Sequence, residues 1–375
     1  MVVWMAALRG HDGNWNSTVA LPTLTAPRVA HTDTWNRLAR PDTPMTAKPK
    51  IFIDGEAGTT GLQIRDRLAA LATVDVVSID PALRKDPSAR AALMRIVDLV
   101  VLCLPDDAAI EATALADSLG ARGPRLIDAS SAHRIAPGWT YGFAELDAAQ
   151  AGAIAASRRV TNPGCYPTGG IALLRPLVDA HLIPADHPIT VNAVSGYSGG
   201  GNAMIAAYEV TKSAASDLSP AASASAAGSR APAFELYGLT LEHKHVPELQ
   251  AYSKLTRRPI FVPSVGNFRQ GMLVSIPLHL DTLPGKPSAT DLEAALTNHY
   301  KGSPLVTVIP NATKSLGGRI AADTLTNTDK LELTVFANEP LAQAVLVARL
   351  DNLGKGAAGA AVQNLRLMLG LAARR

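Results

Sequence analysis

From Lys50 onward the chain alternates short apolar stretches with helical ones, and this alternation limits the folds open to it. The expected strands are KIFID at 50–54, VDVVSID at 74–80, DLVVLCLP at 98–105 and PRLIDAS at 124–130. Stretches with helical spacing, such as LQIRDRLAAL at 62–71, separate them. Strands that alternate with helices form a parallel sheet with helices on its faces. The pattern therefore predicts an α/β fold built on a doubly wound parallel sheet.

The second half of the chain has a different pattern. Longer alternating runs occur at 260–268, 271–280 and 331–338, and they favour an antiparallel or mixed sheet. We therefore expect two units: a Rossmann-like domain over residues 48–164, completed by a C-terminal helix within 352–375, and an α+β domain over 165–351.

Residues 1–47 lack the pattern of either unit. They carry several prolines, scattered tryptophans and no sustained period. We expect a dispensable extension, either disordered or an incorrectly assigned start of translation. A targeting or partner-binding arm is the alternative.

Composition excludes several classes of protein. The 375 residues carry a net charge of only +3 without a basic block, which gives nucleic-acid binding little support. No apolar run approaches the roughly 18 residues that span a bilayer. The two cysteines, Cys103 and Cys165, cannot form a disulfide framework or a four-ligand zinc site by themselves. We therefore expect a cytoplasmic protein that acts on a small molecule and has no metal site.

The turn between the first strand and the first helix is rich in glycine. Gly55, Gly58 and Gly61 are spaced G-x-x-G-x-x-G in the sequence GEAGTTG. At this position backbone N–H groups and the helix N-terminus can receive a pyrophosphate, and glycines let the backbone approach it. We expect these glycines, with Thr59 and Thr60, to bind a dinucleotide. A plain glycine-rich turn is the alternative.

Residues near the end of the second expected strand bear on the choice of dinucleotide. Asp80 stands where an acid usually accepts a hydrogen bond from the ribose 2′-hydroxyl of NAD, but Arg84 and Lys85 follow within reach of a 2′-phosphate. We favour NADP.

One cysteine stands at a tight turn in the sequence NPGCYPTGG. Cys165 precedes an apolar helical run, so the helix N-terminus would stabilise its thiolate and lower its pKa. We expect a nucleophile, and a small buried side chain is the alternative. Cys103 lies in a buried strand and is expected to be inert.

A histidine pair occurs in LEHKHVPEL, with His243, His245 and Glu248. Both rings can approach one point only if the segment is extended, and a neutral imidazole can take a proton from a thiol and later donate it. Glu248 could orient the imidazole. Metal ligation lacks an obvious third ligand, and purely structural histidines remain an alternative.

These segments together carry a resemblance to a known family. The chain resembles N-acetyl-γ-glutamyl-phosphate reductases of arginine biosynthesis, in particular their shorter second type, from Lys50 to the C-terminus. The matching segments, in chain order, are DGEAGTTGLQIRDRL, LIDASSAHRIAPGWTYGFAEL, NPGCYPTG, SGYSGGG, HKHVPE and DNLGKGAAGAAVQNLRLMLG. The N-terminal extension has no counterpart in the family, and residues 218–232 are unusually rich in Ala and Ser.

The resemblance implies an NADPH-dependent reduction of an acyl phosphate to an aldehyde. Cys165 would form a thioester, His245 would be the acid/base and Glu248 would orient it, with His243 as the fallback acid/base. The second domain would be the catalytic and dimerisation domain of a homo-oligomer, either a dimer or a tetramer.

Further contacts are expected within the same segments. We expect Arg134, Ser195, Gly196 and Ser198 to bind substrate, and a solvated surface arginine is the alternative for Arg134. We expect Ser130 and Asn352 to contact the cofactor. The alternatives for the whole protein are another acyl-phosphate reductase such as aspartate-semialdehyde dehydrogenase, a non-catalytic nucleotide-sensing module, and a redox-sensing thiol protein.

Overall fold

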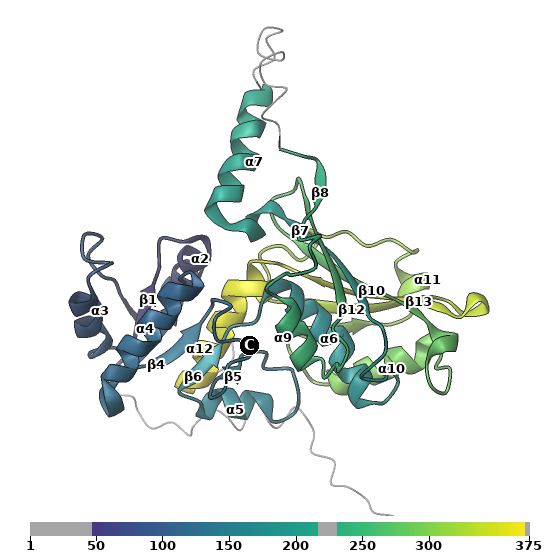
Figure 1. Ribbon diagram of the computed structural model, residues 1–375, viewed down its shortest axis with the longest axis horizontal. Coiled ribbons are helices and arrows are strands. Elements are labelled where there is room, and N and C mark those ends of the chain that lie inside the picture. Colours follow the sequence, from purple (N-terminus) through teal and green to yellow (C-terminus); the bar gives the residue numbers. More distant parts are fainter. Residues whose placement is uncertain (1–46, 217–230, 372–375) are drawn as a thin grey trace, which may run out of the picture.

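The computed structural model describes residues 47–216 and 231–371, which form two β-sheets side by side (Figure 1). Expectations for residues 1–46 and for most of the Ala- and Ser-rich stretch lie outside the described residues.

The first sheet has six strands, all parallel, in the order β2-β1-β3-β4-β6-β5. The strands, in that order, are β2 (Asp75–Val77), β1 (Lys50–Asp54), β3 (Leu99–Leu102), β4 (Arg125–Asp128), β6 (Arg159–Thr161) and β5 (Thr140–Tyr141). This order confirms the predicted doubly wound parallel sheet, because strands β1 and β3 lie in the middle and the chain moves outward in both directions.

Helices cover both faces of this sheet (Figure 1). One face packs against α3 (Pro87–Met94) and α4 (Asp106–Ser118). The other face packs against α2 (Thr59–Ala69), α5 (Gln150–Ala156) and α12 (Gly359–Leu369). A short turn of 3₁₀-helix, η1 (Gly120–Arg122), follows α4.

The second sheet has seven strands and is mixed, in the order β11-β12-β13-β10-β7-β9-β8. The strands are β11 (Val306–Ile309), β12 (Leu331–Asn338), β13 (Gln343–Leu350), β10 (Met272–His279), β7 (Thr190–Gly196), β9 (Ile260–Gly266) and β8 (Phe234–Leu236). The pairs β11/β12 and β7/β9 are parallel and the others are antiparallel. The expected mixed sheet is therefore present.

Three helices and the second sheet bury one large apolar core. The helices are α6 (Cys165–Asp179), α9 (Val246–Tyr252) and α10 (Ala289–His299). Every residue from Tyr166 to Val178 in α6 is buried, so α6 is the central helix of this unit. Shorter elements complete it: η2 (Tyr197–Gly200), η4 (Leu280–Thr282), α11 (Ala312–Ser315), η5 (Glu339–Leu341) and the π-helix η6 (Gly354–Ala358).

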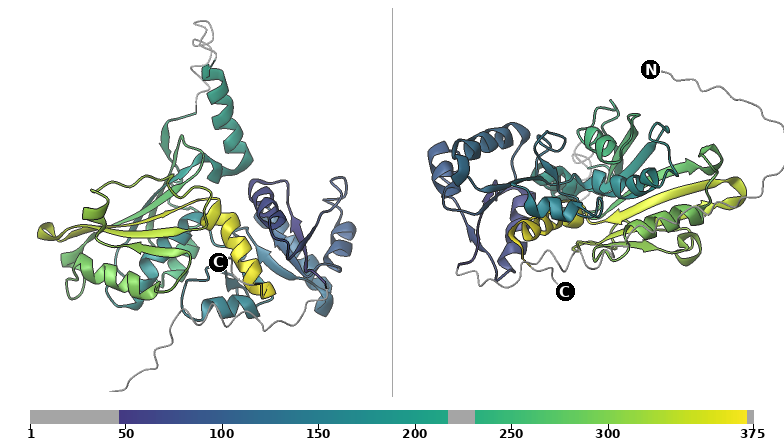
Figure 2. Two further views of the ribbon diagram at one scale, coloured as in Figure 1. Left: turned by 180° about the vertical axis from the view of Figure 1, so that it is seen from behind. Right: turned by 90° about the horizontal axis from the view of Figure 1, so that it is seen from below.

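Helix α7 (Gly201–Ser216) projects away from both sheets, as the two views in Figures 1 and 2 show. Among the described residues, no helix combines the length and the apolar character needed to cross a membrane.

The C-terminal helix α12 lies on the first sheet although the second sheet precedes it in the chain (Figure 2). Leu365 is fully buried and Met368 is nearly so, and both belong to the same apolar cluster as Ile51 and Val101 in the centre of that sheet. On these contacts we propose that residues 48–164 together with α12 form the first domain, and residues 165–351 the second.

Leu365→Ala tests this arrangement. We expect the substitution to lower the free energy of unfolding by about 2–5 kcal/mol, because it leaves a cavity under the sheet. Leu365→Met keeps the volume and should cost less than about 1.5 kcal/mol. The measurement is urea denaturation followed by circular dichroism. Leu341→Ala, at a side chain that is 62% exposed, is the matched control. An equal midpoint for Leu365→Ala and the control would show that α12 adds nothing to the core.

Candidate active site

Cys165 is the first residue of α6, at the point where the chain leaves the first sheet. Gly164 is the N-cap, with an extended backbone (φ −69°, ψ 150°) and no side chain to cap the helix. The N-terminal N–H groups of α6 therefore remain available near the thiol. The structure confirms the predicted place of Cys165 at a helix N-terminus.

Gly164 brings two predicted site residues against this turn. A Cβ atom added to Gly164 would lie 2.7 Å from His245 Nε2 and 2.7 Å from Arg134 Nη1. Because only a hydrogen atom fits there, the residue before Cys165 packs directly on the imidazole and the guanidinium. The structure thus places Cys165, His245 and Arg134 in one site.

The two histidines lie close together but not on an extended segment, which corrects our expectation. His245 has helical backbone angles (φ −85°, ψ −11°) as the N-cap of α9. A turn brings the rings of His243 and His245 within 4.8 Å of each other, between centroids. The backbone N–H of His245 donates to Nδ1 of His243 over 3.2 Å. His245 is only 8% exposed, and it is the histidine that packs against Gly164.

Both histidines have a pKa below the ordinary value for histidine in this environment. Burial, with Arg134 as the next cause, lowers the pKa of His245 well below 6.5. Burial, with Lys244 as the next cause, lowers the pKa of His243 to about 4. The Nδ1 atom of His245 has no hydrogen-bond partner among the described residues. At neutral pH His245 is therefore an uncharged imidazole, as the predicted acid/base role requires.

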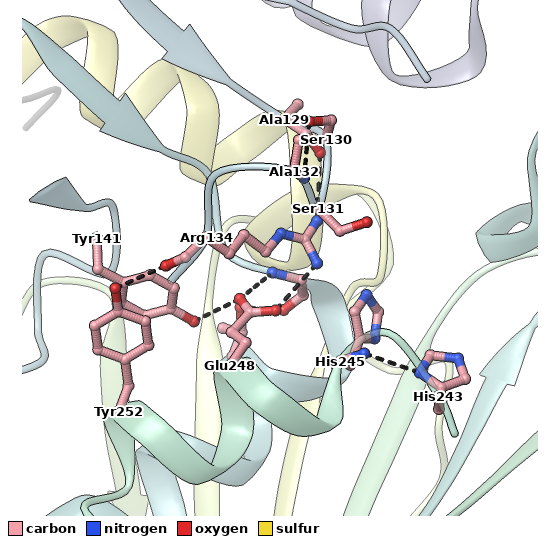
Figure 3. A network of polar contacts seen from close by, with 12 residues as sticks. Ala129, Ser130, Ser131, Ala132, Arg134, Tyr141, His243, His245, Glu248 and Tyr252 are labelled. Atoms are coloured by element: carbon pink, nitrogen blue, oxygen red, sulfur yellow. Dashed lines mark hydrogen bonds and ion pairs between the residues drawn. The ribbon is translucent and has the colours of Figure 1, made fainter. Parts of the chain in front are cut away.

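Glu248 does not orient His245, and this corrects the role predicted for it. Its carboxylate, 1% exposed, accepts hydrogen bonds from Arg134 Nη1 (3.0 Å), the Tyr141 hydroxyl (2.7 Å) and the backbone N–H of Gly164 (2.8 Å). Figure 3 shows the carboxylate between Arg134 and Tyr141. Among the described residues, no hydrogen bond joins this carboxylate to His245, whose Nδ1 has no partner. Its place is instead beneath the turn that presents the cysteine.

The pKa of Cys165 moves in the direction opposite to the one we predicted. Burial raises it to about 11, against smaller lowering effects of Arg134 and the backbone N–H of Tyr166. The helix N-terminus alone does not offset the loss of hydration. The site therefore holds a thiol beside a neutral imidazole. Burial also raises the pKa of Cys103, to about 12, in agreement with an inert thiol.

Arg134 is a buried residue, so the alternative of a solvated surface arginine is wrong. Its side chain is 8% exposed and forms an ion pair with Glu248. Nη2 donates to the carbonyl oxygen of Ala129 over 3.3 Å, while Nε has no partner among the described residues. A buried guanidinium with an unused N–H next to the nucleophile suits an anionic substrate.

The glycine-rich turn has the close backbone contacts that a dinucleotide site needs. Gly55 has a φ of +91°, and a Cβ atom there would lie 2.3 Å from the carbonyl oxygen of Cys103. A Cβ atom on Gly61 would lie 2.5 Å from the carbonyl oxygen of Gly55. Gly58 is the N-cap of α2 without a side-chain cap, and Thr59 and Thr60 begin the helix. The first N–H groups of α2 are thus open to a phosphate.

Residues beyond β2 that bear on the cofactor lie in an exposed turn. Asp80 Oδ1 accepts a hydrogen bond from the backbone N–H of Ala82 over 2.9 Å, so this acid stabilises its own turn. Arg84 and Lys85 are exposed in the same turn. Their contact with a 2′-phosphate stays a prediction.

Asn352 lies in one buried cluster with Ser195, Gly196 and Ser198, which are three of the four residues predicted to bind substrate. Asn352 Oδ1 accepts from the backbone N–H of Gly271 (2.8 Å), and its Nδ2 donates to Ser198 Oγ (2.9 Å). Ser195 Oγ donates to the carbonyl oxygen of Gly196 over 3.0 Å. Asn352 therefore fixes the end of the 195–201 loop, and its predicted contact with the cofactor remains untested.

Ser130 is held at the carboxyl end of β4. Its backbone N–H and its hydroxyl both donate to Asp128, over 2.9 and 2.8 Å. His133 Nδ1 lies 2.6 Å from the same carboxylate. The side chain of Ser130 is therefore oriented at the sheet edge where nucleotides bind in folds of this kind.

Sequence reasoning missed a second buried cluster on the other side of the cysteine. Lys355, 1% exposed, donates to Glu145 Oε2 and Gln363 Oε1, each over 2.7 Å. Next to it, a Cβ atom on Gly356 would lie 2.9 Å from Cys165 Cβ. The π-helix η6 thus packs directly against Cys165. Among the described residues, no group of three or more His, Cys, Asp or Glu side chains is placed to hold a metal ion.

Comparisons with known proteins agree with this geometry. Curated N-acetyl-gamma-glutamyl-phosphate reductases from Brucella ovis and Brucella melitensis are 53% identical to the chain over 327 residues, covering 86% of it and 99% of each relative. The chain belongs to the N-acetyl-gamma-glutamyl-phosphate reductase family. Residues 165–352 also match the family described as semialdehyde dehydrogenase, dimerisation domain.

Solved structures show the same fold as this reductase family member. Aspartate semialdehyde dehydrogenase II from Vibrio cholerae, in complex with ASA, has a TM-score of 0.64 at 15% identity and covers 86% of the chain and 99% of its own. Aspartate semialdehyde dehydrogenase from Francisella tularensis has a TM-score of 0.63 at 14% identity, covering 84% and 99%. These neighbours establish the two-domain fold, while the sequence relatives establish the family.

Alkylation of the free enzyme by iodoacetamide tests the protonation state of Cys165. Because burial raises its pKa to about 11, the thiolate fraction at pH 7 is about one in ten thousand. The alkylation rate should rise about tenfold per pH unit from pH 7 towards pH 10, since only the thiolate reacts. Mass spectrometry of the Cys103→Ala variant isolates the signal of Cys165. A rate that levels off below pH 7 would show that the helix N-terminus outweighs burial.

Proposed function

We propose that this protein reduces N-acetyl-L-glutamyl 5-phosphate to N-acetyl-L-glutamate 5-semialdehyde with release of phosphate, in arginine biosynthesis. The observation that carries the proposal is the placement of Cys165 at the start of α6, with Gly164 packed between the neutral His245 and Arg134. The 53% identity to N-acetyl-gamma-glutamyl-phosphate reductases over nearly their whole length supports the choice of substrate.

The side chains at this site have distinct tasks. The sulfur of Cys165 forms a bond to the acyl carbon, and His245 accepts the proton of the thiol as that bond forms. The carbon–oxygen bond to phosphate then breaks, which leaves a thioester on Cys165. Backbone N–H groups at the start of α6 are candidates to stabilise the oxyanion, and Arg134 to bind the anionic substrate.

The cofactor supplies the reducing equivalents. When bound, the nicotinamide provides the hydride that brings the thioester to the aldehyde level. His245 gives its proton to the substrate oxygen as the carbon is reduced, and takes it back as the carbon–sulfur bond breaks. The proton then returns to the sulfur of Cys165, so the semialdehyde leaves and the thiol is restored. The glycine-rich turn suits this cofactor because Gly58 caps α2 without a side chain, which leaves the first N–H groups of the helix open to a phosphate. Gly55 and Gly61 allow the turn to pack tightly, since a Cβ atom at either would meet the backbone of Cys103 or Gly55. We propose NADP as the cofactor, with Thr59, Thr60, Ser130 and Asn352 as further contacts.

The oligomeric state and the cellular compartment are proposed on the following grounds. The description of residues 165–352 as a dimerisation domain supports a homo-oligomer, and we propose a dimer or tetramer in the cytoplasm. Ser195, Gly196 and Ser198 are proposed to bind substrate, because Asn352 orders their loop next to the site.

Cys165→Ser tests the thioester chemistry. The assay is the phosphate-dependent oxidation of N-acetylglutamate semialdehyde with NADP, with aspartate semialdehyde run beside it. We expect the variant to lose all but a few per cent of turnover while it still binds NADP, because the glycine-rich turn and the nucleophile lie on separate segments. Cys103→Ala should retain turnover. A wild-type enzyme that oxidises only aspartate semialdehyde would replace the proposed substrate, and an active Cys165→Ser would remove the thioester.

Changing Arg84 and Lys85 to Ala tests the choice of cofactor. We expect the affinity for NADP to fall at least about tenfold, because a charge-assisted contact with a phosphate contributes about 1.5–3 kcal/mol. The affinity for NAD should stay within about twofold, since NAD carries no 2′-phosphate. Titration of the cofactor by fluorescence measures both. Equal weakening of NADP and NAD would refute the assignment of this turn.

A further inference from the structure

Tyr141 at the end of β5 contacts the candidate active site. It lies within the segment LIDASSAHRIAPGWTYGFAEL, but it has no role in the sequence predictions or in the proposed chemistry. Its side chain is 2% exposed, and its hydroxyl donates to Glu248 Oε1 over 2.7 Å. We propose that Tyr141 is a positioning residue: through Glu248, its hydroxyl sets how closely the helix that carries His245 approaches the turn that carries Cys165.

The carboxylate of Glu248 joins those two segments. Glu248 lies in the first turn of α9, and His245 is the N-cap of the same helix. The oxygen that accepts from Tyr141 also accepts from the backbone N–H of Gly164 over 2.8 Å. A single oxygen atom therefore ties α9 to the residue that immediately precedes the nucleophile.

The other oxygen of Glu248 has a different donor. Oε2 accepts from Arg134 Nη1 over 3.0 Å, and this guanidinium also lies against Gly164. Without the Tyr141 hydroxyl, the carboxylate would keep its ion pair but lose one of the two donors to Oε1. We expect it to shift towards Arg134 and to loosen its hold on Gly164.

Tyr252 holds the ring of Tyr141 in place. The two rings stack with centroids 3.6 Å apart and planes inclined by 12°. The Tyr252 hydroxyl donates to the carbonyl oxygen of Arg134 over 2.7 Å. Tyr141, Glu248, Arg134 and Tyr252 therefore form a closed ring of contacts, which Figure 3 shows. Tyr141 cannot turn away from Glu248 without separating this stack.

The charge of Glu248 also acts on the pKa of Cys165. Burial raises the pKa of Tyr141 well above 10, so its hydroxyl stays protonated and donates to the carboxylate. The carboxylate of Glu248 raises the pKa of Cys165, and Arg134 lowers it. A donor on Glu248 weakens its field at the thiol, so removing that donor should disfavour the thiolate further.

Tyr141→Phe keeps the ring and its stack but removes the hydroxyl. This test by turnover rests on the proposed function. We expect kcat to fall about tenfold, because the approach of His245 to Cys165 is disturbed, while KM for both substrates stays within about twofold. Tyr300→Phe is the matched control: it removes a buried hydroxyl that donates to the carbonyl oxygen of Ala172 in the same helix α6, further along it. The control should lose stability but keep its kcat.

A double-mutant cycle with Glu248→Gln separates positioning from general support of the fold. If Tyr141 acts through the carboxylate, Tyr141→Phe should lower kcat in the wild type and cause no further loss in Glu248→Gln. Independent, additive losses in kcat would overturn the proposal. A kcat within twofold of the wild type in Tyr141→Phe, or an equal loss in Tyr300→Phe, would overturn it as well.

Alkylation of Cys165 by iodoacetamide at pH 8 repeats the cycle without any substrate. Tyr141→Phe should slow alkylation at least about threefold, Glu248→Gln should accelerate it, and the double variant should match Glu248→Gln. A wild-type enzyme inactive towards N-acetylglutamate semialdehyde would end the proposed function, yet this cycle would still decide the role of Tyr141. Unchanged alkylation in Tyr141→Phe would overturn that role.

Discussion

A carboxylate buried in the protein interior needs donors around it, and the active site of this protein is built around one. Leaving the carboxylate of Glu248 without partners would cost several kcal/mol. Its three donors come from Arg134, from Tyr141 and from the backbone of Gly164. The first two belong to the part of the chain that forms the first sheet, while Glu248 belongs to the second unit. The hydrogen bonds to this one carboxylate therefore connect the two units and hold the turn before Cys165.

A buried cation near Cys165 needs partners in the same way. Lys355 is buried with its Nζ atom against Glu145 and 5.5 Å from the centre of the Phe143 ring. Glu145 lies in the first half of the chain and Lys355 in the π-helix η6, so this pair also joins distant segments. The residues that flank Cys165 in space therefore each adjoin a buried ion pair: Gly164 lies against the pair Arg134–Glu248, and Gly356 follows Lys355 of the pair Lys355–Glu145. Contacts of this kind suit a site in which a thiol and a neutral imidazole must meet in one geometry.

Much of this could be predicted from the sequence because it depends on local patterns. Alternating strands and helices indicated the parallel sheet, and the spacing of glycines located the turn before α2. The role of Glu248 was predicted wrongly, because three residues along a chain suggest a neighbour of His245 while the helix turns its carboxylate towards Gly164. Tyr141 and Lys355 were missed because their partners lie 107 and 210 positions away. The pKa of Cys165 also depended on burial, which a local pattern does not reveal.

The route of the chain after the second sheet has a consequence for how such enzymes diversify. The π-helix η6 lines the nucleophile and leads directly into α12, which covers one face of the first sheet. A recombination event that exchanged only the segment before Cys165 would leave the incoming sheet facing a foreign α12. It would also replace Glu145, the buried partner of Lys355, with the residue of another protein. An exchange of the first part alone would therefore have to preserve both the face that α12 covers and the carboxylate that Lys355 contacts.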